Sequence, residues 1–312
     1  MSDLSIAFLF PGQGSQAVGM GRDLVEKFTV ARDTFAEADA ALGYSLSKLC
    51  FEGPAEQLKQ TEFTQPAIFA VSMAACRVLA SRGVTPQIAA GHSLGEYAAC
   101  AAAGMMSFAD AIRALRARGQ FMQAAVPAGQ GAMAAVLGLD AEAVKAVCAS
   151  AAQATGQAVS PANLNSPEQI VISGTAAGVT RASELAKDAG AKKVVPLQVS
   201  APFHCALMQP AQDRLAEMLH GIEVRDPAFP IVSNVTAEET KSGDRERELL
   251  VKQVTGPVRW VESMRHMIDA GVGTFVEVGP GRVLSGLMRQ IDRAQKCVNV
   301  EDAASLEKAL AG

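Results

Sequence analysis

The pattern of apolar and polar positions along the chain predicts strands that alternate with helices. The first apolar run, residues 4–10 (LSIAFLF), ends at a Pro-Gly pair, which is typical of a buried strand followed by a tight loop. Helical patterns then dominate to about Val126, interrupted by a short predicted strand before Gly91. Further strands are predicted within residues 229–235, 274–278 and 296–300. This order predicts a mostly parallel sheet covered by helices.

The pattern changes between residues 128 and 199. A strand is followed by a helix that begins at Asp140, then by two strands, a helix with Thr175 as its N-cap, and a last strand. The order β-α-β-β-α-β is the split βαβ arrangement of ferredoxin-like domains. We therefore predict an α/β fold with a small ferredoxin-like domain at 128–199, inserted into a large domain that residues 1–127 and 200–312 form together.

Composition and charge narrow the function classes. The chain has 312 residues, of which 49% are hydrophobic and 19% charged, so it can bury a sizeable core. A net charge of -4 without a basic stripe, and 5% aromatic residues, argue against a nucleic-acid partner. The N-terminal apolar run is shorter than a membrane span and lacks the flanks of a signal peptide, which indicates a cytoplasmic protein without a membrane segment. Six scattered cysteines without a C-x-x-C pair predict neither a metal site nor disulfides.

Residues 89–100 (AAGHSLGEYAAC) place Ser93 in a G-x-S-x-G pattern with Gly91 and Gly95. In a strand-turn-helix elbow, glycines fit where the chain reverses and the serine projects at a helix N-terminus. The backbone N–H of Leu94 would there donate to an oxyanion. Serine also caps helices at such positions. The pentapeptide alone therefore indicates a nucleophile and a capping residue about equally.

A nucleophilic serine needs a base, and the chain has four histidines. His220 lies at a predicted helix end and His266 on a predicted surface face. His92 adjoins Ser93, and its side chain is expected to point away from the hydroxyl, which leaves it a supporting role. His204 lies on a loop between the last strand of the small domain and a new helix. Because loops at domain junctions often carry binding and catalytic residues, His204 is the best candidate base.

The sequence marks no acidic partner for His204. Asp226 and Asp292 are candidates, but neither lies in a recognisable motif. A backbone carbonyl is the alternative acceptor, which would make a Ser-His dyad. Cys205, next to the histidine, fits a buried structural thiol better than a nucleophile.

The glycine-rich loop FPGQGSQAVGMG follows the first predicted strand. It is not a G-x-G-x-x-G fingerprint and has no phosphate-loop lysine, so it does not support nucleotide binding. Its position would set the backbone N–H of Gln13 at the mouth of the sheet, where it suits a second oxyanion donor. A simple strand-to-helix turn is the alternative.

Arg118 lies in the predicted helix FADAIRALRARGQFMQAAV, at the edge of its apolar stripe. An arginine at an apolar margin needs an anionic partner, and its planar fork suits a carboxylate. By helix geometry alone, an ion pair with an acidic residue or extension to solvent is the more common arrangement.

Nine segments, in this order, resemble malonyl-CoA:acyl-carrier-protein transacylases of bacterial fatty acid synthesis and the acyltransferase domains of polyketide synthases. The segments are FPGQGSQ, TQPAIFA, GHSLGEYAA, RGQFMQ, GAMAAVLGL, NSPEQIVISG, SAPFHCALM, PIVSNVTA and FVEVGPGRVLSGL. The resemblance covers nearly the whole chain and implies a hydrolase-like large domain with a ferredoxin-like insertion.

The resemblance implies a role for each matching position. The nucleophile of the family falls on Ser93 and its base on His204. The oxyanion-hole amides fall on Gln13 and Leu94. The carbonyl that orients the histidine falls on Gln253, which would account for the missing acid.

The resemblance also implies a substrate pocket. The arginine that holds the malonyl carboxylate falls on Arg118, and a pocket glutamine on Gln65, with His92 beside the nucleophile. Phe203 departs from the commonest bacterial pattern, where several free-standing enzymes have serine. In polyketide acyltransferase domains, phenylalanine at this position accompanies malonyl and serine accompanies methylmalonyl, so malonyl is implied here.

The implied activity is transfer of malonyl from malonyl-CoA to the phosphopantetheine thiol of acyl carrier protein, through an acyl-serine and with ping-pong kinetics. It needs no cofactor and no metal, and the family is usually monomeric. An acyl hydrolase with the same dyad, and a non-catalytic module that binds carrier protein, are the alternatives.

Overall fold

A six-stranded sheet forms the centre of the larger part of the molecule. The computed structural model describes residues 5–311, so Leu4 of the first predicted strand lies outside the described residues. The strands are β1 (Ser5–Phe10), β2 (Ile88–Gly91), β7 (Ile231–Val232), β8 (Glu239–Thr240), β9 (Val272–Val278) and β10 (Lys296–Val300). They lie in the order β10-β9-β1-β2-β7-β8, and every pair is parallel except β7 with β8. The predicted mostly parallel sheet is thus confirmed.

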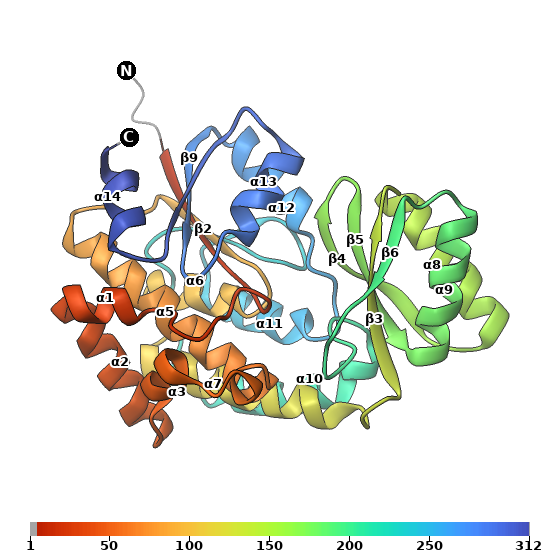
Figure 1. Cartoon of the computed structure of the whole chain (residues 1–312), viewed down its shortest axis with the longest axis horizontal. Helices are drawn as coiled ribbons and strands as arrows, with labels where there is room; N and C mark the ends of the chain where they lie inside the picture. Colours follow the sequence, from red (N-terminus) through yellow and green to blue (C-terminus); the bar gives the residue numbers. More distant parts are fainter. Residues whose placement is uncertain (1–4, 312) are drawn as a thin grey trace.

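Helices cover both faces of this sheet (Figure 1). Alternate residues of β1 point to opposite faces: Phe8 and Phe10 pack with the cluster around α5, whereas Ala7 and Leu9 pack with α12 and α13. The helices of this part are α1 (Arg22–Lys27), α2 (Thr29–Leu42), α3 (Leu46–Glu52), α4 (Ala55–Leu58), α5 (Thr61–Ser81), α6 (Gly95–Ala102), α7 (Phe108–Ala125), α10 (Gln209–His220), α11 (Gly243–Gln253), α12 (Trp260–Asp269), α13 (Val283–Ile291) and α14 (Ala303–Ala311), with a short 3₁₀ helix at Ala206–Met208.

The long helix α5 is the central helix of the core. By length and composition it could cross a membrane, but 83% of its apolar window is buried inside the protein. It packs against α2 and α7 and contains buried side chains on all sides. Its all-round apolar character follows from this burial.

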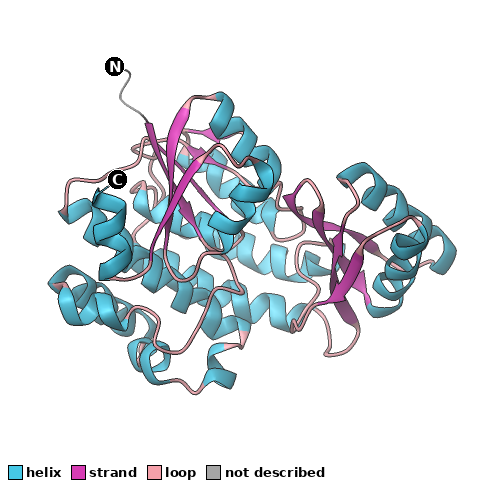
Figure 2. Ribbon diagram, turned by 45° about the horizontal axis from the view of Figure 1, so that its top comes forward, coloured by secondary structure: helices cyan, strands magenta, loops and turns pink. Residues whose placement is uncertain are grey.

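A second, antiparallel sheet lies beside the first, with its own helices (Figure 2). Its elements are β3 (Gly131–Leu137), α8 (Ala141–Thr155), β4 (Val159–Ser166), β5 (Gln169–Thr175), α9 (Ala176–Asp188) and β6 (Lys193–Pro196). The strand order β4-β5-β3-β6 is that of a split βαβ unit. Asp140 and Thr175 cap α8 and α9 as predicted. The predicted fold class is therefore confirmed, whereas the boundaries at 128 and 199 stay predictions.

The small sheet contributes to the core of the large one. One face packs on α8 and α9, and the other carries Met133, Ala135 and Val171, which belong to the main hydrophobic cluster. An isolated parallel bridge joins Asn163 of β4 to Val258, just before α12. The small sheet is thereby joined to the segment that leads into α12.

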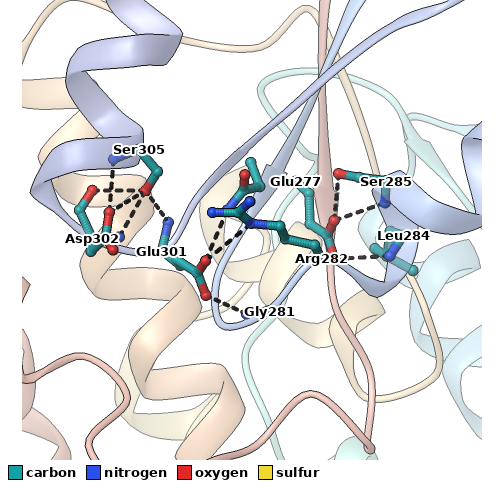
Figure 3. Close-up of polar contacts among 9 residues, drawn as sticks. Glu277, Gly281, Arg282, Leu284, Ser285, Glu301, Asp302 and Ser305 are labelled. Carbon is teal, nitrogen blue, oxygen red and sulfur yellow. Dashed lines mark hydrogen bonds and ion pairs between the residues drawn. The ribbon is translucent and has the colours of Figure 1, made fainter.

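A buried glutamate near the end of β9 accepts hydrogen bonds from the first turn of α13 (Figure 3). Glu277 is fully buried and accepts hydrogen bonds from the backbone N–H groups of Leu284 and Ser285 at 2.9 and 2.8 Å, and from the Ser285 hydroxyl at 2.7 Å. Glu301 accepts from the N–H of Gly281 in the intervening loop. The first residue of this loop, Gly279, has φ 136°, and a Cβ there would lie 2.3 Å from the Ser72 hydroxyl. The loop is therefore fixed in place from both of its ends.

Candidate active site

Ser93 lies on a sharp turn between β2 and α6. Its φ is 53°, in the left-handed region that a residue with a Cβ rarely adopts. A Cβ on Gly91 would lie 1.9 Å from the backbone of Gly95, and one on Gly95 would lie 2.2 Å from the carbonyl oxygen of Phe10. The turn therefore requires both glycines. Helix α6 has no side-chain cap, so Ser93 is not the capping residue that the pentapeptide also allowed.

His204 contacts the Ser93 hydroxyl directly. Its Nε2 lies 2.7 Å from Ser93 Oγ, while its Nδ1 lies 2.9 Å from the carbonyl oxygen of Gln253 and 3.2 Å from that of Gly256. Carbonyl oxygens only accept, so the proton is on Nδ1 and Nε2 is free to accept the proton of the serine. Burial, with the charge of Arg118, lowers the pKa of His204 to about 3. The imidazole is thus held neutral, as a general base requires.

The other candidates for a triad lie elsewhere. Asp226 accepts a hydrogen bond from the backbone of Gly243, and Asp292 accepts from Ala294 and Gln295. The Cys205 thiol is buried and donates to the carbonyl oxygen of Pro202, and burial raises its pKa. Backbone carbonyls, and no carboxylate, orient the histidine.

Arg118 is a buried cation beside the serine. The residue is only 2% exposed, and its Nη2 lies 3.0 Å from Ser93 Oγ. Its two other contacts are amide oxygens, of Gln65 and Gln253, both at 2.8 Å. Within residues 5–311 it has no ion pair with a carboxylate, and its Nε–H has no partner. The site therefore holds an arginine edge, Nε and Nη2, that is able to bind a small anion.

A cavity of about 120 Å³ lies over these groups. Every residue that the sequence predicted for the site lines it except Gln253, whose contacts are described above. Phe203 forms part of its wall and is 9% exposed. The backbone N–H groups of Gln13 and Leu94 form no hydrogen bond in the described part of the chain, which leaves both available to an oxyanion.

His92 points away from Ser93 Oγ, as predicted. Its Nε2 lies 2.8 Å from Asn165 Oδ1, and its ring packs against Trp260 with the centroids 5.4 Å apart. Burial lowers the pKa of His92. Because Asn165 belongs to β4, this contact joins the turn at Ser93 to the small sheet.

Sequence reasoning missed two residues behind the serine, Asn234 and Glu96, and the contacts of the Gln253 side chain. Asn234 Oδ1 accepts from the backbone N–H of Ser93 at 2.8 Å, and its Nδ2 donates to the carbonyl oxygen of Gly91. Glu96 and the side chain of Gln253 complete a buried polar cluster there. One signal was available: Glu96 is the only acidic residue in the apolar segment LGEYAACAAAG. An acidic residue in such a segment needs buried donors.

Comparisons with known proteins agree with this geometry. Residues 7–308 match the family model described as the acyl transferase domain. A malonyl CoA-acyl carrier protein transacylase of Bacillus subtilis is 50% identical over 98% of this chain and 96% of its own length. One from Escherichia coli is 50% identical over 91% of this chain and 92% of its own.

Two solved structures resemble this chain over nearly its whole length. An acyl carrier protein S-malonyltransferase from Vibrio cholerae has a TM-score of 0.95 at 48% identity, covering 98% of this chain and 99% of its own. A malonyl-transacylase solved in complex with a type II PKS acyl carrier protein gives the same TM-score, identity and coverage. With its site geometry, its fold and these relatives in agreement, the chain belongs to the acyl transferase family.

Proposed function

We propose that the protein transfers a malonyl group from malonyl-CoA to the phosphopantetheine thiol of an acyl carrier protein, through an acyl intermediate on Ser93. One observation carries the proposal: a buried arginine without a carboxylate partner lies 3.0 Å from a serine hydroxyl that contacts a neutral histidine. The names of the full-length relatives support the same reaction.

In the first half-reaction, His204 Nε2 accepts the proton of Ser93 as Oγ attacks the thioester carbonyl. The N–H groups of Gln13 and Leu94 donate to the oxyanion. When the C–S bond breaks, the thiolate of CoA takes the proton from His204. The carrier thiol then gives its proton to His204 as its sulfur attacks the acyl carbonyl. When the bond between Ser93 Oγ and the acyl carbon breaks, Oγ takes this proton from His204, which regenerates the enzyme.

Arg118 supplies the specificity for malonyl. Its Nε and Nη2 would bind the free carboxylate, and Gln65 and Gln253 hold the guanidinium in position. An acetyl group would leave the buried Nε–H of Arg118 unpaired, which costs roughly 1 to 3 kcal/mol. The ring of Phe203 in the cavity wall would crowd an α-methyl group and so favours malonyl over methylmalonyl.

The proposed reaction uses no metal and no cofactor besides its CoA and carrier-bound substrates. Among residues 5–311, no group of three or more metal-ligating side chains is suited to hold an ion. We further propose a cytoplasmic monomer whose carrier protein serves fatty acid or polyketide synthesis. A net charge of -4 with no basic stripe in the sequence supports an absence of nucleic-acid partners.

Intact-mass measurement after mixing with malonyl-CoA tests the proposal. The wild type should gain one malonyl group that persists until a phosphopantetheinylated carrier protein is added, and Ser93→Ala should gain none. Rapid release of malonate without acceptor would instead show a hydrolase. A folded wild type that never takes up the label would show a binding module.

A further inference from the structure

A fully buried carboxylate lies directly behind the serine and takes no part in the mechanism above. Glu96, in the first turn of α6, is 0% exposed. It accepts hydrogen bonds from the Ser233 hydroxyl at 3.0 Å, from the backbone N–H of Asn234 at 3.0 Å, and from Nε2 of Gln253 at 2.7 Å. Burial raises the pKa of Glu96, and the three donors act against this effect by favouring the ionised form.

The contact with Glu96 determines which way the Gln253 amide points. With Nε2 on Glu96 and on the carbonyl oxygen of Ser93, at 3.0 Å, the other end, Oε1, faces Arg118 Nη2 at 2.8 Å. A flipped amide would set its oxygen against the carboxylate and its NH₂ against the guanidinium, which makes two repulsive contacts. A neutral group in place of the Glu96 carboxylate would weaken this preference, which the Ser93 carbonyl oxygen and Arg118 would then maintain alone.

A second carboxyl group supplies a proton to the first. Glu246 of α11 is also 0% exposed, shares a side-chain hydrogen bond with Glu96, and accepts through Oε1 from the Cys100 thiol. Two buried carboxyl groups in contact do not both ionise. Glu96 has three donors, whereas Glu246 has only the Cys100 thiol among the described donors, so Glu246 keeps the proton and Glu96 is the anion. Burial and the Glu96 charge hold the pKa of Glu246 well above its usual range.

We propose that Glu96 is a positioning residue: as the anionic member of the pair with Glu246, it fixes the Gln253 amide and through it the orientation of Arg118, and so sets the preference for malonyl over acetyl thioesters. The proposal rests on the function proposed above. It also gives the buried cation of Arg118 a counter-charge one amide away, although the two side chains share no ion pair.

The test is the ratio of malonyl to acetyl loading on Ser93 in Glu96→Gln. Acetyl loading uses Ser93 and His204 but not the anion-binding edge of Arg118, so the ratio isolates the effect of positioning. A neutral side chain at position 96 holds the Gln253 amide less firmly than the carboxylate does. We therefore expect the ratio of the malonyl to the acetyl kcat/KM to fall about tenfold or more, mostly because the malonyl value falls. A folded variant that keeps the wild-type ratio overturns the proposal.

Glu246→Gln is the matched control. It makes the same chemical change one contact further away, and its NH₂ replaces the proton that Glu246 donates to Glu96. The ratio should stay within about threefold of the wild type. An equal fall in both variants would show a general packing effect and would overturn the specific role of Glu96.

A double-mutant cycle with Gln253→Met tests whether Glu96 acts on Arg118 through the Gln253 amide. That change removes the amide but keeps the backbone carbonyl on His204. If Glu96 acts through the amide, adding Glu96→Gln to Gln253→Met should lower the ratio by less than about twofold more. Additive losses would overturn the route.

Circular dichroism and thermal unfolding verify folding. Should Glu96→Gln not fold, Glu96→Asp keeps the charge but withdraws the carboxylate by one methylene, and it should lower the same ratio to an intermediate value, whereas an unchanged ratio would overturn the proposal. Failure of the proposed function is seen separately, since the wild type itself would then not load malonyl.

Discussion

Two strand-turn-helix units of the large sheet, β2–α6 and β9–α13, each bury a glutamate completely, yet the two carboxyl groups differ in where their donors come from. Glu277 accepts only from residues within eight positions of itself in the chain, at the start of its own helix (Figure 3). Glu96 accepts from Ser233, Asn234 and Gln253, more than a hundred residues away.

The difference separates a structural role from a functional one. A carboxyl group whose donors lie at the start of the next helix along the chain fixes local geometry, as an N-cap does. A carboxyl group satisfied by distant segments fixes those segments relative to each other, and here they carry the contacts of Ser93 and Arg118. Equal burial of the same residue type therefore does not predict equal effects of mutation.

The largest expected effect concerns Arg118 of α7, which contacts Ser93 at the β2–α6 turn. Arg118→Ala should lower malonyl-CoA loading by roughly 100-fold, and acetyl-CoA loading by less than tenfold, because only malonyl loses its counter-ion. Stopped-flow or quenched mass spectrometry of the acyl-enzyme measures both. Arg113→Ala, in the same helix with an exposed ion pair to Asp110, is the control and should change neither. Equal losses for the two thioesters would remove Arg118 from specificity.

Glu277→Gln tests the β9–α13 unit, where we expect a loss of stability and no loss of activity. An amide NH₂ in place of one carboxylate oxygen leaves at least one buried backbone N–H unsatisfied, so the free energy of unfolding should fall by roughly 1 to 3 kcal/mol. Urea denaturation measures this loss. Malonyl loading by the folded protein at 25 °C should stay within about twofold of the wild type. A selective loss of malonyl loading would show that the β9–α13 unit also serves the site.

Acidification should lower the free energy of unfolding through His204, which contacts Ser93 at the β2–α6 turn. The pKa of His204 is about 3 when folded and about 6.5 when unfolded, so its contribution to stability is complete above pH 6.5 and is lost as pH falls. Between pH 7.5 and 5.5 this one group should cost about 1.4 kcal/mol of unfolding free energy. The wild type and Glu277→Gln should both show this loss, and His204→Gln should lack it. An unchanged pH dependence in His204→Gln would contradict the depressed pKa.

The smallest expected effect lies in the cavity wall opposite the turn. Phe203→Ser should raise methylmalonyl loading relative to malonyl by about fivefold to tenfold, since it opens room for one methyl group. Competition between the two CoA esters, read by intact mass, measures the ratio. If the ratio does not move, Phe203 does not limit the α-substituent.

Local patterns predicted the fold class and marked Ser93, His204 and Arg118 as candidates, and the nine ordered segments implied their roles. The β-α-β-β-α-β order and the caps Asp140 and Thr175 are local, and the structure has them. The predicted strand at residues 229–235 is shorter, paired only at Ile231–Val232. After Val232, the Ser233 hydroxyl and the backbone N–H of Asn234 donate to Glu96 instead of continuing the strand.

The polar cluster behind Ser93 could not be predicted from the sequence, because its members come from distant segments of the chain. Glu96, Asn234 and Gln253 come from separate segments that only the fold brings together, and no spacing along the chain signals the contact. The resemblance indicated the Gln253 carbonyl, whereas the role of its side chain depends on which way an amide points. Amide orientation follows from a complete hydrogen-bond network and from nothing in the sequence alone.

The left-handed backbone at Ser93 limits how the protein can be engineered. Of the three described non-glycine residues with positive φ, two are Ser93 and His204. Such a conformation costs roughly 1 to 3 kcal/mol for a residue with a Cβ, and glycine would relieve it. A screen that ranks variants by thermostability alone would therefore reward glycine at these two positions and enrich inactive protein. Stabilised versions for biocatalysis have to be selected on acyl-enzyme formation as well as on melting temperature.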